Sequence, residues 1–248
     1  MVKPILKPVF YQKGHQLTGF VMVYIIEGNI GAGKSTFLSL LKNKIPGLSI
    51  IQEPVNSWAS QRQGASLLEN FYINPKRWAF TLETYTMIAR SLELQSLNTT
   101  PGIILMERSL YSGHYCFAKN GYSQGFFSNV EWDVYNTWAE FFLQEKNVIP
   151  QGFIYLQASP NVCFERIQRR NRNGEQTIAL EYLEQIHNCH EQFLVEKEGV
   201  FNQLKSVPVL TLNANNEFEQ AQETLNEHLN QLMSFIQTTQ QQAKFRDF

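Results

Sequence analysis

A glycine-rich segment at residues 28–35 limits the possible folds of this chain more than any other feature of its sequence. It reads GNIGAGKS, which fits the pattern GxxxxGK[ST], and it lies between a short apolar run at 21–26 and an amphipathic stretch at 34–41. In a strand–turn–helix context, such a turn points backbone N–H groups and a helix N-terminus at phosphate oxygens. Lys34 would then reach the transferred phosphate, and Ser35 would hold Mg²⁺. The predicted phosphate-binding residues of this loop are Gly28, Asn29, Ile30, Gly31, Ala32, Gly33, Lys34, Ser35 and Thr36.

Short apolar runs alternate with longer helical stretches along the rest of the chain. Strands are expected at 21–26, 48–51, 103–106, 153–156 and 207–212, and helices at 34–41, 78–97, 130–143, 160–170, 179–204 and 218–235. Such alternation is typical of a parallel sheet with right-handed crossovers and helices on both faces. We therefore predict an α/β protein with a P-loop kinase fold and a five-stranded parallel sheet.

No repeat or long linker divides the chain, so its 248 residues are expected to form one domain. We predict that this domain spans 22–236, after a flexible N-terminal arm at 1–21 and before a polar tail at 237–248. The arm lacks arginine and a cleavage site, so it is a poor targeting peptide. The polar run at 237–242 is expected to fray.

The charge and the cysteines restrict the possible partners and compartment. A formal net charge of −1 gives no basic field for a nucleic-acid polymer or an anionic membrane. Cys116, Cys163 and Cys189 are widely spaced and show no metal-binding pattern, which suits free thiols in a reducing compartment. No apolar run is long enough to span a bilayer. We expect a cytoplasmic protein, although the sequence does not exclude a mitochondrial one.

Charged residues follow two of the predicted strands, where ligands of parallel sheets bind. Glu53 follows the second strand and could accept a proton from an attacking hydroxyl, although a surface glutamate is the alternative. Glu107 and Arg108 follow the third strand. Arg108 could stabilise the charge of the transferred phosphate and Glu107 could join Ser35 around Mg²⁺, unless the two form only a structural ion pair.

Four arginines crowd into a short stretch at the end of the helix predicted at 160–170: Arg166, Arg169, Arg170 and Arg172. Arg166 and Arg170 share one face of that helix, and the asparagines and glycine at 171–174 would allow a loop to open and close. This predicts an Arg-rich lid over the phosphates. A solvated basic helix end is the alternative.

A P-loop alone does not identify the acceptor, because several classes of nucleotide-binding protein share it. The other motifs do: EPV at 53–55, ERS at 107–109, YLQASP at 155–160, the arginine cluster followed by LEYL at 180–183, and VPVL at 207–210. Together with the P-loop, they resemble the deoxynucleoside kinase family, most closely its deoxyguanosine and deoxycytidine kinase branch. The resemblance runs from about residue 25 to residue 232.

The resemblance implies a transfer of the γ-phosphate of ATP, with Mg²⁺, to the 5′-hydroxyl of a deoxynucleoside. It implies Glu53 as the base, with Lys34, Arg108 and Arg172 as stabilisers of the charge. Tyr72 and Glu175 would bind the sugar 3′-hydroxyl, and Trp58 and Phe117 would line the base pocket. Arg170 and Phe218 would flank the adenine of ATP.

Two positions depart from the family pattern. Glu83 stands where members usually carry a glutamine that meets the base, and Gly113 stands where this branch has an aspartate. An ionised carboxylate only accepts hydrogen bonds, so Glu83 would favour bases that present N–H donors. Arg90, on the same helix face, could supply a donor. Our hypothesis is that Glu83 replaces the lost carboxylate, keeps Arg90 engaged and favours deoxyguanosine or another amine-bearing base, although a small residue at 113 is typical of thymidine-accepting relatives.

The helix predicted at 130–143 presents Tyr135, Trp138, Phe141 and Phe142 among few charges. Family members are dimers, so we predict a homodimer; burial of these residues in the core is the alternative.

Two rival functions also remain open from the sequence: a kinase for another small acceptor, such as a nucleoside monophosphate, and a non-catalytic subunit that binds nucleosides.

Overall fold

The computed structural model describes residues 21–42, 44–45, 48–53, 66–96, 102–145, 149–172, 174–218 and 222–246. Five parallel strands form one sheet in the order β2-β3-β1-β4-β5. The predicted α/β fold and five-stranded parallel sheet are confirmed. The strands are β1 (Val21–Glu27), β2 (Ser49–Ile51), β3 (Gly102–Glu107), β4 (Gly152–Gln157) and β5 (Val209–Asn213).

Both faces of the sheet are buried, because alternate residues of the central strand β1 enter two separate cores. Val23 and Ile25 belong to one apolar cluster, whereas Tyr24 and Ile26 belong to the other. A strand that is covered on both faces reads as a continuous apolar run. This explains why β1 was recognisable from its sequence.

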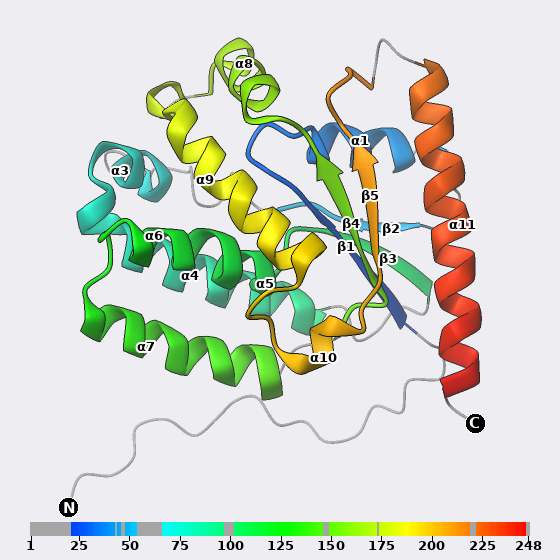
Figure 1. The fold of residues 1–248 in the computed structure, drawn as a ribbon, viewed down its shortest axis with the longest axis horizontal. Helices are drawn as coiled ribbons and strands as arrows, with labels where there is room; N and C mark the ends of the chain where they lie inside the picture. The colour runs from blue at the N-terminus through cyan, green and yellow to red at the C-terminus, as the bar shows by residue number, and fades with distance from the viewer. Residues whose placement is uncertain are drawn as a thin grey trace, which may run out of the picture.

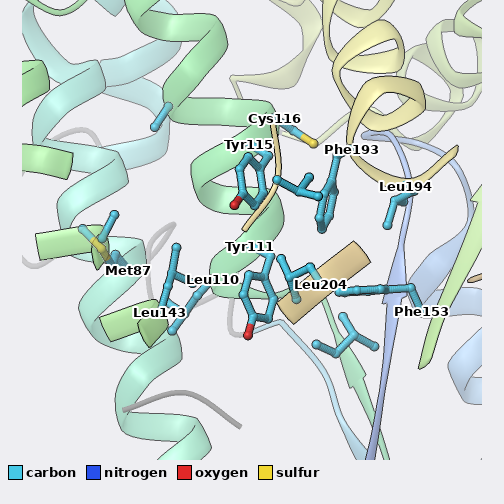
Figure 2. Close-up of a cluster of buried hydrophobic side chains, with 14 of the residues drawn as sticks. Met87, Leu110, Tyr111, Tyr115, Cys116, Leu143, Phe153, Phe193, Leu194 and Leu204 are labelled. Atoms are coloured by element: carbon cyan, nitrogen blue, oxygen red, sulfur yellow. The ribbon is translucent and has the colours of Figure 1, made fainter. Parts of the chain in front are cut away.

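The first core is covered by a group of helices that also makes one wall of the site. These are α4 (Pro75–Ser96), α5 (Leu110–Ser112), the π-helical turn η1 (Gly113–Ala118), α6 (Lys119–Ser123), α7 (Asn129–Glu140), the π-helical turn η2 (Phe141–Glu145) and α9 (Leu180–His190). Figure 1 shows α4, α6 and α7 gathered on one side of the sheet. Figure 2 shows how Met87 of α4, Tyr111 of α5 and Phe153 of β4 belong to one buried cluster.

The second core lies under α1 (Lys34–Lys42), α8 (Pro160–Arg170) and α11 (Gln222–Arg246). Helix α8 begins and ends with local signals that the sequence carries. Ser159 accepts a hydrogen bond from the Val162 N–H at 3.4 Å, Pro160 occupies the first turn, and Asn171 ends the helix in a left-handed conformation. The boundaries predicted for α8 are therefore correct.

The observed helices differ from the prediction at 179–204 and at 67–73. The stretch at 179–204 is divided into α9, the π-helical turn η4 (Glu191–Glu196) and α10 (Asn202–Lys205). The break follows Lys197 and Gly199, which both have positive φ, and the Lys197 ammonium donates to the carbonyls of Lys205 and Val207 at 2.9 and 2.6 Å. Helix α3 (Leu67–Ile73) was not predicted; it begins with a capping box between Ser66 and Glu69.

The expectation that the run at 237–242 frays is wrong, because α11 continues through it to Arg246. Thr239 is buried and shares a 2.6 Å hydrogen bond with the hydroxyl of Tyr24, which ties the last turns of the helix to the sheet. Residues 1–20, which make up most of the predicted N-terminal arm, lie outside the described residues. No helix of the described ranges combines the length and the apolar character needed to cross a membrane.

Candidate active site

The turn after β1 holds its shape because glycine stands where a side chain would collide with backbone. Gly28 has φ +148°, and a Cβ there would lie 2.6 Å from the carbonyl oxygen of Leu156. Gly31 has φ +80°, and its Cβ would lie 2.6 Å from the carbonyl oxygen of Cys163 at α8. The loop is therefore wedged between β4 and α8, in a conformation that L-residues with side chains rarely adopt.

Lys34 closes this turn from the inside. Its buried ammonium donates to the carbonyl oxygens of Gly28 at 3.1 Å and Asn29 at 2.8 Å. Burial, together with the positive charge of Arg108, lowers its pKa to about 8. The cation is thus held at the loop but is poorly compensated, which suits a group that meets an anionic ligand.

Glu53 lies at the carboxyl end of β2, within reach of two guanidinium groups. Its carboxylate accepts hydrogen bonds from Arg90 of α4 and from Nε of Arg108 at 3.1 Å. Burial opposes the ionisation of this carboxyl, but the two arginines outweigh it and hold its pKa below the usual range. Glu53 is therefore an ionised carboxylate in a buried cluster, and the alternative of a surface glutamate is excluded.

Ser35 and Glu107 place oxygen atoms side by side between the loop and Glu53. The Ser35 hydroxyl donates to Oε1 of Glu107 at 2.8 Å, and Oε2 of Glu107 lies 3.4 Å from the backbone N–H of Glu53. This hydroxyl–carboxylate pair connects α1 to the end of β3.

Arg108 has a left-handed backbone, with φ +63°. Non-glycine residues in this region are uncommon, because the conformation costs about 1–3 kcal/mol and persists only where its surroundings enforce it. Here the Arg108 N–H donates to the carbonyl of Ile26 at 2.9 Å, and the guanidinium lies 4.6 Å from the ring centroid of Phe117. The neighbouring Ser109 hydroxyl donates to the buried carboxyl of Glu27 at 2.6 Å.

Sequence reasoning missed Glu27 as a supporting residue of this turn. Burial raises its pKa. Glu27 ends β1, just as Glu107 ends β3. Its position as a charged residue at the carboxyl end of a strand is therefore the sequence signal that identifies it.

The arginine cluster is held by two sets of hydrogen-bond acceptors, so it is not simply a solvated helix end. Arg166 donates to the carbonyl oxygens of Ala214 at 2.8 Å and Asn216 at 3.0 Å. Arg170 and Arg172 both donate to the buried carboxylate of Glu175, at 3.1 Å from Nε and 3.2 Å from Nη1 respectively. The connection between α8 and α9, which includes the 3₁₀ turn η3 (Glu175–Thr177), is thereby fixed over the site.

One cavity of about 570 Å³ connects these groups. The predicted residues that line it are Ile30, Gly31, Gly33, Lys34, Ser35, Thr36, Glu53, Tyr72, Glu83, Arg90, Glu107, Arg108, Phe117, Arg166, Arg170, Arg172, Glu175 and Phe218. Trp58 lies outside the described residues. The cavity is also lined by Arg169 of the predicted arginine cluster. Lining residues that the sequence did not single out are Gln52, Leu68, Phe71, Leu82, Thr86, Tyr182 and Glu217.

Gly113 stands behind Arg90 at the α4 wall of the cavity. A Cβ at this position would lie 2.8 Å from Nη1 of Arg90, so the glycine leaves room for the guanidinium that contacts Glu53. Sequence reasoning paired Arg90 with Glu83, and in the structure Arg90 donates to Glu53 across the cavity. Glu83 is buried beside it, and burial raises its pKa to about 7.

The chain is similar to known proteins over nearly its whole length. A family profile described as deoxynucleoside kinase matches residues 24–237. Human deoxycytidine kinase is 37% identical over 235 residues, which cover 85% of this chain and 90% of that protein. The mitochondrial deoxyguanosine kinase of Xenopus laevis is 37% identical over 233 residues, which cover 85% of this chain and 88% of that protein. All the described cavity residues fall within the matched range.

Proposed function

This chain belongs to the deoxynucleoside kinase family and is thus an ATP-dependent deoxynucleoside kinase, and we propose that Glu53 activates the 5′-hydroxyl of the nucleoside. The observation that supports this role is that an ionised carboxylate, with a side chain only 9% exposed, lines the same cavity as the P-loop lysine. A positioned carboxylate within reach of a hydroxyl acts as a general base. The hydroxyl would attack the γ-phosphate in line while Glu53 takes its proton.

Lys34 and the backbone of the P-loop would bind the phosphates of ATP. The ammonium would exchange the carbonyls of Gly28 and Asn29 for phosphate oxygens, which raise its pKa and keep it charged. Arg108 and Arg172, which both line the cavity, would stabilise the charge on the transferred group. Arg170 and Phe218 would flank the adenine. The Phe218 ring packs against the ring of Phe37, with 5.3 Å between the two ring centroids, and this contact holds it in place.

Ser35 and Glu107 fit the requirements of a magnesium ion. Mg²⁺ prefers hard oxygen ligands and is usually bound through one or two carboxylates together with substrate phosphates, and these two side chains already place oxygens 2.8 Å apart beside the P-loop. When bound, the ion would neutralise charge on the phosphates. Ser35 and Glu107 would orient it.

The nucleoside would lie on the far side of Glu53 from the P-loop. Tyr72 and Glu175 interact electrostatically with each other and line the cavity, where they would bind the 3′-hydroxyl. Phe117 would cover one face of the base, and Trp58 remains a predicted second contact. Glu83, Arg90 and Gly113 would set the base preference, which we expect to favour deoxyguanosine or another amine-bearing base.

We further propose that the enzyme is a homodimer that uses an apolar face of α4 and α7. The two helices pack against each other, and each presents exposed apolar side chains at helical spacing. This α4/α7 face consists of Tyr85, Ile88 and Leu92 of α4, Val130, Val134 and Trp138 of α7, and Phe141 of the adjoining turn η2. Contiguous exposed apolar surface marks interaction sites.

The three free cysteines suit a reducing compartment such as the cytoplasm.

A substrate panel tests the proposed function. ADP release is measured with ATP, Mg²⁺ and each of the four deoxynucleosides, and in parallel with their 5′-monophosphates. We expect release with at least one deoxynucleoside and a 5′-monophosphate as product. ADP release with monophosphates alone would reject the proposed acceptor.

A further inference from the structure

The α4 wall of the cavity carries a carboxyl group that the proposed chemistry does not use. Glu83 is 8% exposed and lines the cavity beside Leu82 and Thr86 of the same helix. No hydrogen bond within the described part of the chain occupies its carboxylate, whereas Glu53, Glu107 and Glu175 all have such partners. A buried polar group without a partner is costly, so this carboxyl is expected to find its partner on a ligand.

The position of Glu83 identifies the part of the ligand that it meets. The P-loop fixes the phosphates at one end of the cavity, and Glu53 is the proposed base for the 5′-hydroxyl. Phosphate, 5′-carbon, sugar and base follow one another in a nucleoside, so the base extends beyond Glu53. The α4 wall, which contacts Glu53 through Arg90, contributes the lining residues Leu82, Glu83, Thr86 and Arg90. Glu83 is an acidic lining residue of this wall, and the charges that act on it are those of Arg90, Glu53 and Arg108. We therefore expect it to meet the base rather than the phosphates.

Carboxyl groups recognise ring edges in two different ways. A protonated carboxyl donates through O–H and accepts through C=O, as an amide does, so it can pair with the neighbouring donor and acceptor that every base presents. An ionised carboxylate only accepts. Guanine presents two neighbouring N–H donors, which match the two oxygens of a carboxylate, whereas thymine presents one N–H between two carbonyls.

We propose that Glu83 reads the base in both protonation states, so that the preference of this enzyme for deoxyguanosine over deoxythymidine increases as the pH rises. This inference rests on the proposed function and names the feature of the substrate that the site recognises. It also modifies the expectation drawn from the sequence, because an acceptor-only Glu83 is only one of the two states.

The surroundings of Glu83 support a carboxyl that titrates near neutral pH. Burial raises its pKa to about 7, and the negative charge of Glu53 adds to this, while Arg90 and Arg108 act against it. Tyr135 of α7 and Tyr182 of α9 also face it, and the pKa of each is raised, so both stay neutral. Ionisation of Glu83 is therefore the charge change that we expect next to the base between about pH 6 and about pH 8.

The test is a competition between deoxyguanosine and deoxythymidine for one enzyme in one vessel, from about pH 6 to about pH 8. The product ratio gives the ratio of kcat/KM values, in which any pH dependence of Glu53 or Lys34 cancels. Neither base changes its charge in this range. We expect the ratio of deoxyguanosine to deoxythymidine kcat/KM to rise at least about fivefold with pH. This is the discrimination that results when one two-point hydrogen-bond contact to a base is gained or lost.

Two variants make the result specific. Glu83→Gln keeps the shape but does not titrate, so its ratio should stay constant with pH. Glu93→Gln removes another α4 carboxyl, whose pKa is raised to about 6, and its ratio should rise as in the wild type. A constant ratio in the wild type, or an equal rise in Glu83→Gln, would overturn the inference while leaving the kinase activity established. If neither nucleoside is phosphorylated, the inference is overturned, whereas the proposed acceptor is rejected only when all four deoxynucleosides fail in the substrate panel.

Discussion

Glu53 receives two guanidinium groups from different parts of the fold, Arg90 from α4 and Arg108 from the end of β3. Charged pairs in a buried site are well defined in geometry because each partner restrains the other. The space for Arg90 depends on Gly113, where a Cβ would lie 2.8 Å from the guanidinium. A single missing side chain at residue 113 thus controls the surroundings of the proposed base.

The substitution Gly113→Ala should move Arg90 away from Glu53 and lower kcat/KM. Misplacement of a reacting group by about 1 Å can cost about 10²-fold in rate, and because the arginine is flexible we expect a loss of about tenfold. Steady-state kinetics measure it. In an Arg90→Ala background the added methyl group meets no guanidinium, so the same change should have little further effect. Equal losses in both backgrounds would contradict this account.

Individual site residues were predictable to different degrees. The P-loop follows from its GxxxxGK[ST] pattern between a strand and a helix. Glu53, Glu107 and Arg108 follow from the rule that ligands bind at the carboxyl ends of parallel strands. The partner of Arg90 did not follow, because helical spacing tells which residues share a face of α4 but not which residue of β2 lies across the cavity. Sequence reasoning therefore placed Arg90 with Glu83, whose charge does act on it, but missed its hydrogen bond to Glu53.

At the scale of elements, the connection from α8 to α9 is organised by one carboxylate. Glu175 is 3% exposed and binds both Arg170 and Arg172, whose side chains are 39% and 38% exposed. Without Glu175, the two guanidinium groups would repel each other and turn toward solvent. Glu175 thus fixes the arginines over the cavity.

Replacing Glu175 with alanine should loosen this connection without unfolding the sheet. Because both arginines are partly solvated, the effect is smaller than for a fully buried pair, and we expect backbone amides between α8 and α9 to exchange about tenfold faster. Hydrogen exchange followed by mass spectrometry measures this, with peptides of β1 and β4 as internal controls. Unchanged exchange in this connection, or equal acceleration in the strands, would show that Glu175 does not organise it.

Elements were predictable where a local signal defines both ends, as in α8. The stretch at 179–204 was not, because its periodicity continues through a break caused by positive φ at Lys197 and Gly199. The polar turns of α11 were misjudged for the opposite reason. Their contact between Thr239 and Tyr24 joins residues 215 positions apart, which local composition does not reveal.

At the scale of the whole molecule, the strand order brings the ends of β1, β2 and β3 together beside the helices α1 and α4 (Figure 1). The same arrangement leaves the α4/α7 face directed away from the sheet. The site and the proposed dimer contact therefore share α4, with Glu83 and Arg90 buried and Tyr85, Ile88 and Leu92 exposed.

Substitutions that introduce charged residues on the α4/α7 face should dissociate the proposed dimer into monomers. We expect the wild type to be a dimer at micromolar concentration by light scattering, and the double variant Ile88→Glu, Trp138→Glu to be a monomer, because a buried, unpaired carboxylate is costly at an interface. Val195→Glu adds a charge at an exposed valine of η4 and should leave the dimer intact. A monomeric wild type, or a double variant that stays dimeric, would reject this interface.

The central claim is that the carboxylate of Glu53 removes the proton of the 5′-hydroxyl opposite the P-loop. Its most direct test is the kcat of nucleoside-dependent ADP release for wild type and Glu53→Gln, with thermal unfolding and ATP binding as checks that the variant is folded. We predict that kcat falls by about 10² to 10⁴-fold while ATP still binds. A folded Glu53→Gln enzyme that phosphorylates its nucleoside at the wild-type rate would contradict the account.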